Sequence, residues 1–168
     1  MLQTRSDCPR CGTHVVRLTR PRNAWDHLFT IVYCYPFRCQ LCRARFRVIQ
    51  PRYRFQARRA DWREYVRIPV EFRTLFSGEQ IRGEGTMVDV SINGCWIKSG
   101  LRVPKGAAIH LCVCSGAQEP PIEIEAAVAW CTVGKGFGLA FFNIHPAHEA
   151  WLRQLITARW AQAHTGEA

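Results

Sequence analysis

The sequence predicts a mainly β protein: a small antiparallel β-barrel that carries a C-terminal helix and is preceded by an N-terminal zinc ribbon. Two C-x2-C pairs near the N-terminus indicate the ribbon. Short alternating segments between turn signals indicate the barrel, and a change to helical spacing near the end indicates the helix. The expected boundaries are 5–49 for the ribbon, 50–60 for a basic linker and 61–163 for the barrel with its helix.

Length and hydropathy limit the class of protein. The 168 residues allow one ordinary domain and a small module. The longest apolar run considered, 29–37, falls well short of the roughly 20 residues that span a bilayer. The first residues lack the apolar core of a signal peptide. We therefore expect a cytoplasmic protein without a membrane span, whose nine cysteines are thiols or metal ligands.

The positive charge is concentrated in the first part of the chain. Residues 1–60 hold 13 arginines and 2 acidic residues, whereas residues 61–168 hold 10 basic and 11 acidic residues. This asymmetry indicates two modules with different roles. A basic module suits nucleic acid, another polyanion or an acidic protein partner, but arginines also keep a small metal module soluble. Charge alone therefore names no partner.

Four cysteines have the spacing of a structural zinc site. Each C-x2-C turn directs two thiolates at one point, and two such turns complete a tetrahedral shell. Pro9 and Gly12 suit a tight turn in the first pair. A redox dithiol would need one pair opening a helix, and a disulfide is disfavoured in the cytosol. The predicted ligands are Cys8, Cys11, Cys39 and Cys42. A closed set of four leaves no open position for catalysis, so the metal should support folding.

The residues between the cysteine pairs leave alternatives open. The apolar positions Trp25, Leu28, Phe29 and Val32 fit one face of a helix or the edge of a strand, and they could dock the ribbon on its neighbour. Zinc ribbons also bind nucleic acid, so phosphate contacts are a second possibility. The arginines suited to those contacts are Arg17, Arg20, Arg22, Arg43, Arg45 and Arg47.

Alternation and turn spacing predict about six short strands from residue 65 onward. The segments 108–114 and 136–142 alternate between apolar and other residues, as does 122–130. In 122–130 the face expected to be apolar comprises Ile122, Ile124, Ala126, Val128 and Trp130. The helix is expected to begin near Pro146 and to pack on the barrel. Its apolar positions are Trp151, Leu152, Leu155 and Ile156.

Two short motifs carry chemistry suited to a guanine nucleotide. Arg63 and Arg67 lie four residues apart before a strand, and an extended chain would project them to one side. Paired arginine donors suit phosphate oxygens and the O6/N7 edge of guanine. Asp89 and Ser91 lie two residues apart, and a carboxylate accepts hydrogen bonds from the N1 and N2 donors of guanine. Gly94 permits a tight bend and a close backbone approach.

The ordered pair of motifs, RxxxR at 63–67 and DxSxxG at 89–94, resembles the PilZ domain. That family is a small β-barrel receptor for the bacterial second messenger cyclic di-GMP, and the resemblance covers about residues 60–157. It implies that Arg63 and Arg67 contact guanine and phosphates, that Asp89 and Ser91 contact a guanine edge, and that Gly94 forms the turn. Trp62 stands just before RxxxR, where many relatives have another arginine, so the resemblance leaves open whether one or two ligands bind.

The leading hypothesis is a cyclic di-GMP receptor in which ligand binding orders the linker, reorients the ribbon and signals to a protein partner. Two alternatives are a nucleic-acid-binding zinc ribbon with a passive barrel, and a ligand-independent adaptor. A solvated arginine pair, with Asp89 and Ser91 capping a turn, would account for the motifs without a ligand. The sequence has neither an HExxH motif nor a glycine loop with a phosphate-binding lysine, and we expect no enzyme activity.

Overall fold

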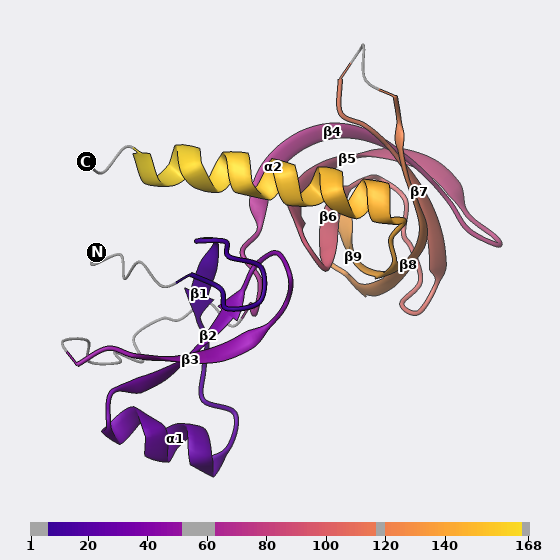
Figure 1. The fold of residues 1–168 in the computed structure, drawn as a ribbon. Helices are drawn as coiled ribbons and strands as arrows, with labels where there is room; N and C mark the ends of the chain where they lie inside the picture. The colour runs from indigo at the N-terminus through magenta and orange to yellow at the C-terminus, as the bar shows by residue number, and fades with distance from the viewer. Residues whose placement is uncertain (1–6, 52–62, 117–119, 166–168) are drawn as a thin grey trace. The chain divides into compact units, whose positions relative to one another are not determined.

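The computed structural model describes residues 7–51, 63–116 and 120–165, and the chain forms two compact units, Met1–Val66 and Arg67–Ala168 (Figure 1). The division falls between Val66 and Arg67, inside the RxxxR motif. Most of the predicted linker and Trp62 lie outside the described residues. The domain boundaries expected from the sequence therefore stay predictions.

The first unit contains a three-stranded antiparallel sheet in the order β1-β2-β3 and one short helix. Pairing of Val16 with Cys39 and of Phe37 with Phe46 sets the register. The Phe37 and Phe46 rings stack with their centroids 6.2 Å apart. The elements are β1 (Val16–Leu18), α1 (Ala24–Ile31), β2 (Cys34–Cys39) and β3 (Arg45–Ile49). The buried apolar residues are few, chiefly Val15, Tyr35, Phe37 and Leu41 beside two of the cysteines, so a metal would add much of the stabilisation.

The segment that could form either a helix or a strand edge forms the helix α1. Asn23 caps it, because its side chain accepts a hydrogen bond from the amide of Asp26 at 2.9 Å. Asp26 is the buried residue of the helix, whereas Trp25 and Leu28 are exposed. Trp25 and Leu28 therefore face solvent, whereas Phe29 is half-buried and lies against Arg47 of β3.

The second unit is a closed antiparallel barrel of six strands in the order β4-β5-β6-β9-β8-β7, which confirms the predicted fold class (Figure 1). Its strands are β4 (Ile68–Ser77), β5 (Arg82–Ser91), β6 (Gly94–Lys98), β7 (Ala108–Cys114), β8 (Ile122–Thr132) and β9 (Gly136–Asn143). Alternation holds along β7, where Ile109, Leu111 and Val113 are each at most 1% exposed. The Phe76 and Phe137 rings meet edge to face in the core.

The face predicted for β8 holds for Ile122 and Ile124 but is wrong for Trp130. Pairing of β8 with β9 shifts between Ala126 and Ala127 and again between Ala129 and Cys131. The first shift reverses the faces of the side chains that lie between the two irregularities. Ala127 and Ala129 consequently enter the core, and Trp130 is 48% exposed.

The C-terminal helix α2 (Pro146–Thr165) begins at the predicted proline and packs against β4 and β8. Leu152 and Ile156 are buried, and the Trp151 ring lies 6.0 Å from that of Phe72 on β4. Figure 1 shows the helix continuing beyond the strands of the barrel, and residues 157–159 and 161–163 are exposed. Neither helix of the described residues combines the length and apolar character needed to cross a bilayer.

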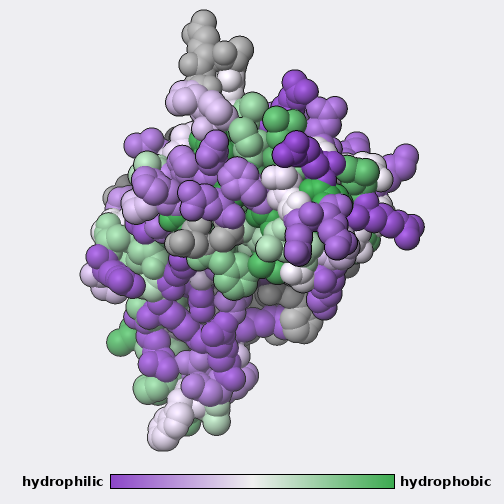
Figure 2. All heavy atoms as spheres, turned by 90° about the vertical axis from the view of Figure 1, so that its right-hand side faces the viewer, coloured by the Kyte–Doolittle hydropathy of each residue, from purple (hydrophilic) through white to green (hydrophobic). Residues whose placement is uncertain are grey.

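Large apolar side chains reach the surface of both units, and Figure 2 shows hydrophobic residues among hydrophilic ones on the face that it draws. In the second unit they are Leu75, Leu101, Trp130, Val133 and Phe142. In the first unit they are Trp25, Leu28, Ile31, Val32, Tyr33 and Ile49. The first three lie on α1, Val32 and Tyr33 follow it in the chain, and Ile49 pairs with Cys34 at the start of β2.

Candidate functional site

The four predicted metal ligands come together in the first unit. The sulfur atoms of Cys8, Cys11, Cys39 and Cys42 all lie within 4.8 Å of one another. Cys8 and Cys42 are 3.5 Å apart, and Cys11 and Cys39 are 3.6 Å apart. A tetrahedron with metal–sulfur bonds of about 2.3 Å has edges of about 3.8 Å, so the cluster fits a single metal ion. The cysteine cluster supports the predicted zinc ribbon.

The two cysteine pairs adopt matching turns. Gly12 and Arg43 each follow the second cysteine of a pair, and both have positive φ, at 70° and 64°. The amides of Leu41 and Cys42 point at the sulfur of Cys39, at 3.4 and 3.3 Å. Glycine adopts this conformation freely, which is the role expected of Gly12, but Arg43 adopts it at a cost. The sequence pattern gave no signal for that strain.

The thiols differ in how readily they ionise. Burial raises the pKa of Cys39 to about 12. Burial acts in the same direction on Cys8, but hydrogen bonds from the backbone of Arg10 and Cys11 and from the side chain of Cys42 outweigh it and lower its pKa to about 7. Four thiolates this close would repel one another unless a cation lay among them. The donor set therefore suits a thiophilic divalent metal, which would hold all four sulfurs deprotonated.

A buried carboxylate fixes α1 to the sheet. Asp26 is 3% exposed and accepts hydrogen bonds from Arg45 at 2.5 Å and Arg47 at 2.8 Å. The backbone amide of Arg22 donates to it at 3.0 Å. That amide bond, followed by the bond from Arg47 and the charges of both arginines, lowers the pKa of Asp26 despite its burial. Arg45 and Arg47, which the sequence offers as phosphate contacts, thus already hold an internal acid.

Residues in and near the second cysteine turn also contact the residues within the RxxxR motif. Gln40, which is 2% exposed, accepts a hydrogen bond from the amide of Val66 at 2.7 Å. Arg38 donates to the hydroxyl of Tyr65 at 2.6 Å and lies over its ring. Glu64 forms ion pairs with Arg22 and Arg38. The role of Gln40 is not predicted by the sequence, because a glutamine between two metal ligands carries no signal of a distant hydrogen-bond partner.

In the second unit, the last arginine of RxxxR meets the acid of the second motif. Arg67 donates to Asp89 at 2.9 Å, and the two side chains are 16% and 24% exposed. The register pairs Pro69 with Asp89, which brings the start of β4 to the end of β5. A donor group and an acceptor group are thus held side by side at a partly solvated position.

The remaining residues of the second motif form the hairpin between β5 and β6. Ser91 pairs with Gly94 across a two-residue turn, and the buried Ser91 hydroxyl donates to the carbonyl of Gly94 at 3.1 Å. A Cβ on Gly94 would lie 2.1 Å from the carbonyl oxygen of Leu139, so the strand pairing requires glycine here. Ser91 therefore closes a turn, which is the structural role weighed for it from the sequence. Arg63 is exposed and belongs to the first unit.

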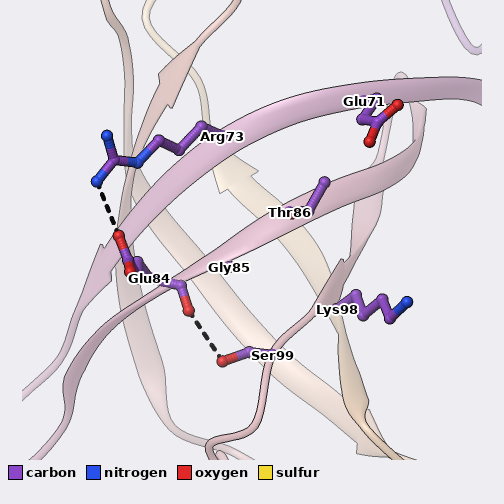
Figure 3. Close-up of a pocket in the computed structure, with 7 residues that line it drawn as sticks. All are labelled: Glu71, Arg73, Glu84, Gly85, Thr86, Lys98 and Ser99. Atoms are coloured by element: carbon purple, nitrogen blue, oxygen red, sulfur yellow. Dashed lines mark hydrogen bonds and ion pairs between the residues drawn. The ribbon is translucent and has the colours of Figure 1, made fainter.

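A separate hollow lies on the outer face of β4, β5 and β6 (Figure 3). Arg73 and Glu84 form an ion pair of 2.9 Å across it, and both side chains are mostly exposed. Ser99 donates to the backbone carbonyl of Glu84 at 3.0 Å. The residues that line it are Glu71, Arg73, Glu84, Gly85, Thr86, Lys98 and Ser99. Its two acids and two bases balance, and it contains no residue of either motif, so we assign no ligand to it.

The family model described as PilZ domain matches residues 57–158. The chain belongs to the PilZ domain family. PilZ domains are binding domains rather than catalytic ones, and the matched segment contains both motifs. The match confirms the family inferred from RxxxR and DxSxxG.

Two solved structures share the fold of this PilZ protein. YcgR from Escherichia coli, in complex with c-di-GMP, has a TM-score of 0.52 and 15% identity over 86% of this chain and 73% of its own. The Bacillus subtilis inhibitor of motility (MotI/DgrA) has a TM-score of 0.51 and 19% identity over 70% of this chain. The match spans 59% of the length of the Bacillus protein. The search of curated proteins finds no match.

Proposed function

We propose that this protein is a cyclic di-GMP receptor and that the meeting of Arg67 with Asp89 marks its ligand site. Family membership supports the ligand, as does the c-di-GMP bound in the YcgR structure of the same fold. The proposed ligand-binding residues are Arg63, Arg67, Asp89, Ser91, Gly94 and Trp62. Arg63 and Trp62 are assigned by their places in and before the motif.

The chemistry of the Arg67–Asp89 pair suits this ligand. The carboxylate of Asp89 can accept hydrogen bonds from the N1 and N2 donors of guanine, while the guanidinium of Arg67 can donate to a phosphate or to O6 and N7. In the free protein the two groups satisfy each other at 2.9 Å. The ligand would replace that ion pair, and the partial exposure of both side chains gives it access. Ser91 and Gly94 would fix the hairpin that carries Asp89.

The contacts of residues 64–66 supply a route for the signal. Gln40 and Arg38 hold Val66 and Tyr65 to the ribbon, while Arg67 is held by Asp89 of the barrel. A ligand that binds both Arg63 and Arg67 would shift residues 64–66 between them. The contacts of these residues with Gln40 and Arg38 would carry that shift to the ribbon and so change the arrangement of ribbon and barrel. It can do so only to the extent that it binds one arrangement more tightly than the other.

A zinc ion held by the four cysteines would stabilise the ribbon and keep the Gln40 turn in place, rather than take part in a reaction. We propose that the protein acts in the bacterial cytoplasm and that a protein partner reads the arrangement. A partner bound equally well with and without the nucleotide would instead indicate a ligand-independent adaptor.

Calorimetric titration of the zinc-loaded full chain with cyclic di-GMP tests the proposal. We expect saturable binding of one or two molecules per chain, with GMP as the control for a single guanine nucleotide. The proposal is wrong if a folded sample gives no binding heat at about 100 μM cyclic di-GMP, because physiological signalling needs a tighter dissociation constant. Small-angle scattering with and without ligand tests the change of arrangement separately.

A further inference from the structure

The helix of the ribbon presents an exposed apolar face. Trp25, Leu28, Ile31 and Val32 are 66%, 53%, 73% and 61% exposed, and together they are named the α1 ridge. Trp25 and Leu28 lie one turn apart on one side of α1, and Val32, the residue that caps its C-terminal end, continues the same spacing. Side chains exposed to this extent project from the surface, since those lining a groove would be partly covered by its walls.

The polar side of this helix is turned inward instead. The buried residue of α1 is the charged Asp26, held by Arg45 and Arg47 of β3. An amphipathic helix normally buries its apolar face and exposes its polar one. Here ion pairs satisfy the inward side, where Phe29 is also half-buried against Arg47, and Trp25, Leu28 and Ile31 are left to solvent. A contiguous exposed apolar face of this kind marks an interaction surface.

The charge around the α1 ridge points to an anionic partner. The described residues of the first unit, 7–51 and 63–66, contain nine arginines, no lysine and three acidic residues, Asp7, Asp26 and Glu64. Asp26 is shared by two arginines, so that cluster keeps one net positive charge. Arg22, next to the helix, is 55% exposed, and Arg47, which lies over the Phe29 ring of α1 at 4.7 Å, is 45% exposed. A second copy of this unit would repel it by like charge. Residues 67–168 hold nine basic and nine acidic residues, so the barrel has no net negative charge to attract it.

We propose that the α1 ridge docks on the surface of an anionic phospholipid bilayer. Its aliphatic side chains would enter the boundary between headgroups and acyl chains, where tryptophan is also favoured. The net positive charge of the unit would attract the anionic headgroups. A bilayer suits a projecting ridge because it deforms around inserted side chains, whereas a protein partner would have to offer a matching groove. The proposal does not depend on the nucleotide.

Co-sedimentation with vesicles tests this proposal on the zinc-loaded full chain. The probes are vesicles of phosphatidylglycerol mixed with phosphatidylcholine and vesicles of phosphatidylcholine alone. We expect binding to the anionic vesicles only, weakened by salt. Ile31→Glu and Leu28→Glu should each reduce the bound fraction roughly tenfold or more, because each places a carboxylate where an apolar side chain would insert. Val133→Glu is the matched control, since Val133 is 66% exposed in the other unit, and it should bind as the wild type does.

Three outcomes would overturn the proposal. One is the absence of binding to anionic vesicles by a sample with intact zinc content and circular dichroism. Another is equal binding by the wild type and the α1 ridge variants, which would indicate general attraction of a basic protein to lipid. The third is self-association of the wild type, by light scattering, that the same variants abolish, which would make a second copy the occupant. Since both α1 ridge positions are exposed, the variants should fold, and zinc content checks this directly.

Discussion

Replacing Arg67 with alanine should weaken cyclic di-GMP binding by roughly 10- to 150-fold. Arg67 is the motif arginine whose partner is Asp89, at 2.9 Å, and its side chain is 16% exposed. In the proposed complex it donates charged hydrogen bonds to the ligand, and losing such a bond costs about 1.5–3 kcal/mol. That free energy corresponds to about one to two powers of ten in the dissociation constant.

The fold itself should tolerate this change. Both members of the Arg67–Asp89 pair remain partly solvated, so the pair contributes only about 0.5–1 kcal/mol to the free energy of unfolding. Urea unfolding should therefore show a nearly unchanged midpoint. Under the same reasoning Asp89→Ala should weaken ligand binding to a similar extent, because it removes the proposed acceptor for guanine.

Arg73→Ala is the matched control, since it removes the same charge and an ion pair of the same length, that with Glu84. That pair lies on the outer face of the barrel (Figure 3), and neither residue belongs to a motif. Titration of the three variants and the wild type should show a loss for Arg67→Ala and Asp89→Ala only. An affinity of Arg67→Ala within about twofold of the wild type would refute the site. If Arg73→Ala lost as much affinity for cyclic di-GMP, the loss in Arg67→Ala would be explained by removal of a positive charge alone.

Other changes test the supports of the site. Cys39→Ser should abolish stoichiometric zinc binding, measured by metal analysis, and should unfold the ribbon while the barrel keeps its thermal transition. Asp26→Asn should lower the free energy of unfolding by about 1–3 kcal/mol, because it weakens buried bonds to Arg45 and Arg47. The folded-state pKa of Asp26 is depressed, so the difference in free energy of unfolding between wild type and variant should be fully present above the unfolded pKa of about 3.9. It should disappear as the pH falls through the folded pKa. A difference that grows in acid would contradict this prediction. Gly94→Ala should destabilise the barrel by about 1–3 kcal/mol or more, because the new Cβ would lie 2.1 Å from the carbonyl oxygen of Leu139. An unchanged melting temperature would contradict this, because it would mean that the pairing of β6 with β9 accommodates a Cβ at this position.

Local patterns carried most of what the sequence revealed. The cysteine turns and the alternation along β7 are properties of neighbouring residues, so spacing alone predicts them. The exit of Trp130 from the apolar face of β8 depends on where that strand pairs irregularly with β9, and such a shift leaves no mark in either segment. α1 was ambiguous for a related reason. Trp25 and Leu28 do not pack on the sheet, and the deciding contacts are those of the charged Asp26 with Arg45 and Arg47 of β3.

The proximity of Arg67 and Asp89 was likewise easier to predict than the contacts of the residues between Arg63 and Arg67. Spacing indicated that Arg67 and Asp89 belong to one kind of site, and in the structure they form an ion pair. The same motif also contains the residues held by the ribbon, through Gln40 and Arg38. Those contacts join positions more than 20 residues apart and use side chains with no conspicuous spacing. Pair contacts of this kind can be read only from coordinates.

Under the proposed function, the position of Gln40 would give a bound metal a part in signalling without contact with the nucleotide. Gln40 follows Cys39 in the second C-x2-C pair. Its side chain accepts a hydrogen bond from the amide of Val66, the residue before Arg67. A bound metal would fix the backbone of that turn and so would fix where the acceptor of Val66 lies. Loss of the metal would release the same turn and with it the hold on the RxxxR segment. Nucleotide affinity and metal occupancy are therefore expected to be thermodynamically coupled, with each changing the other by the same factor.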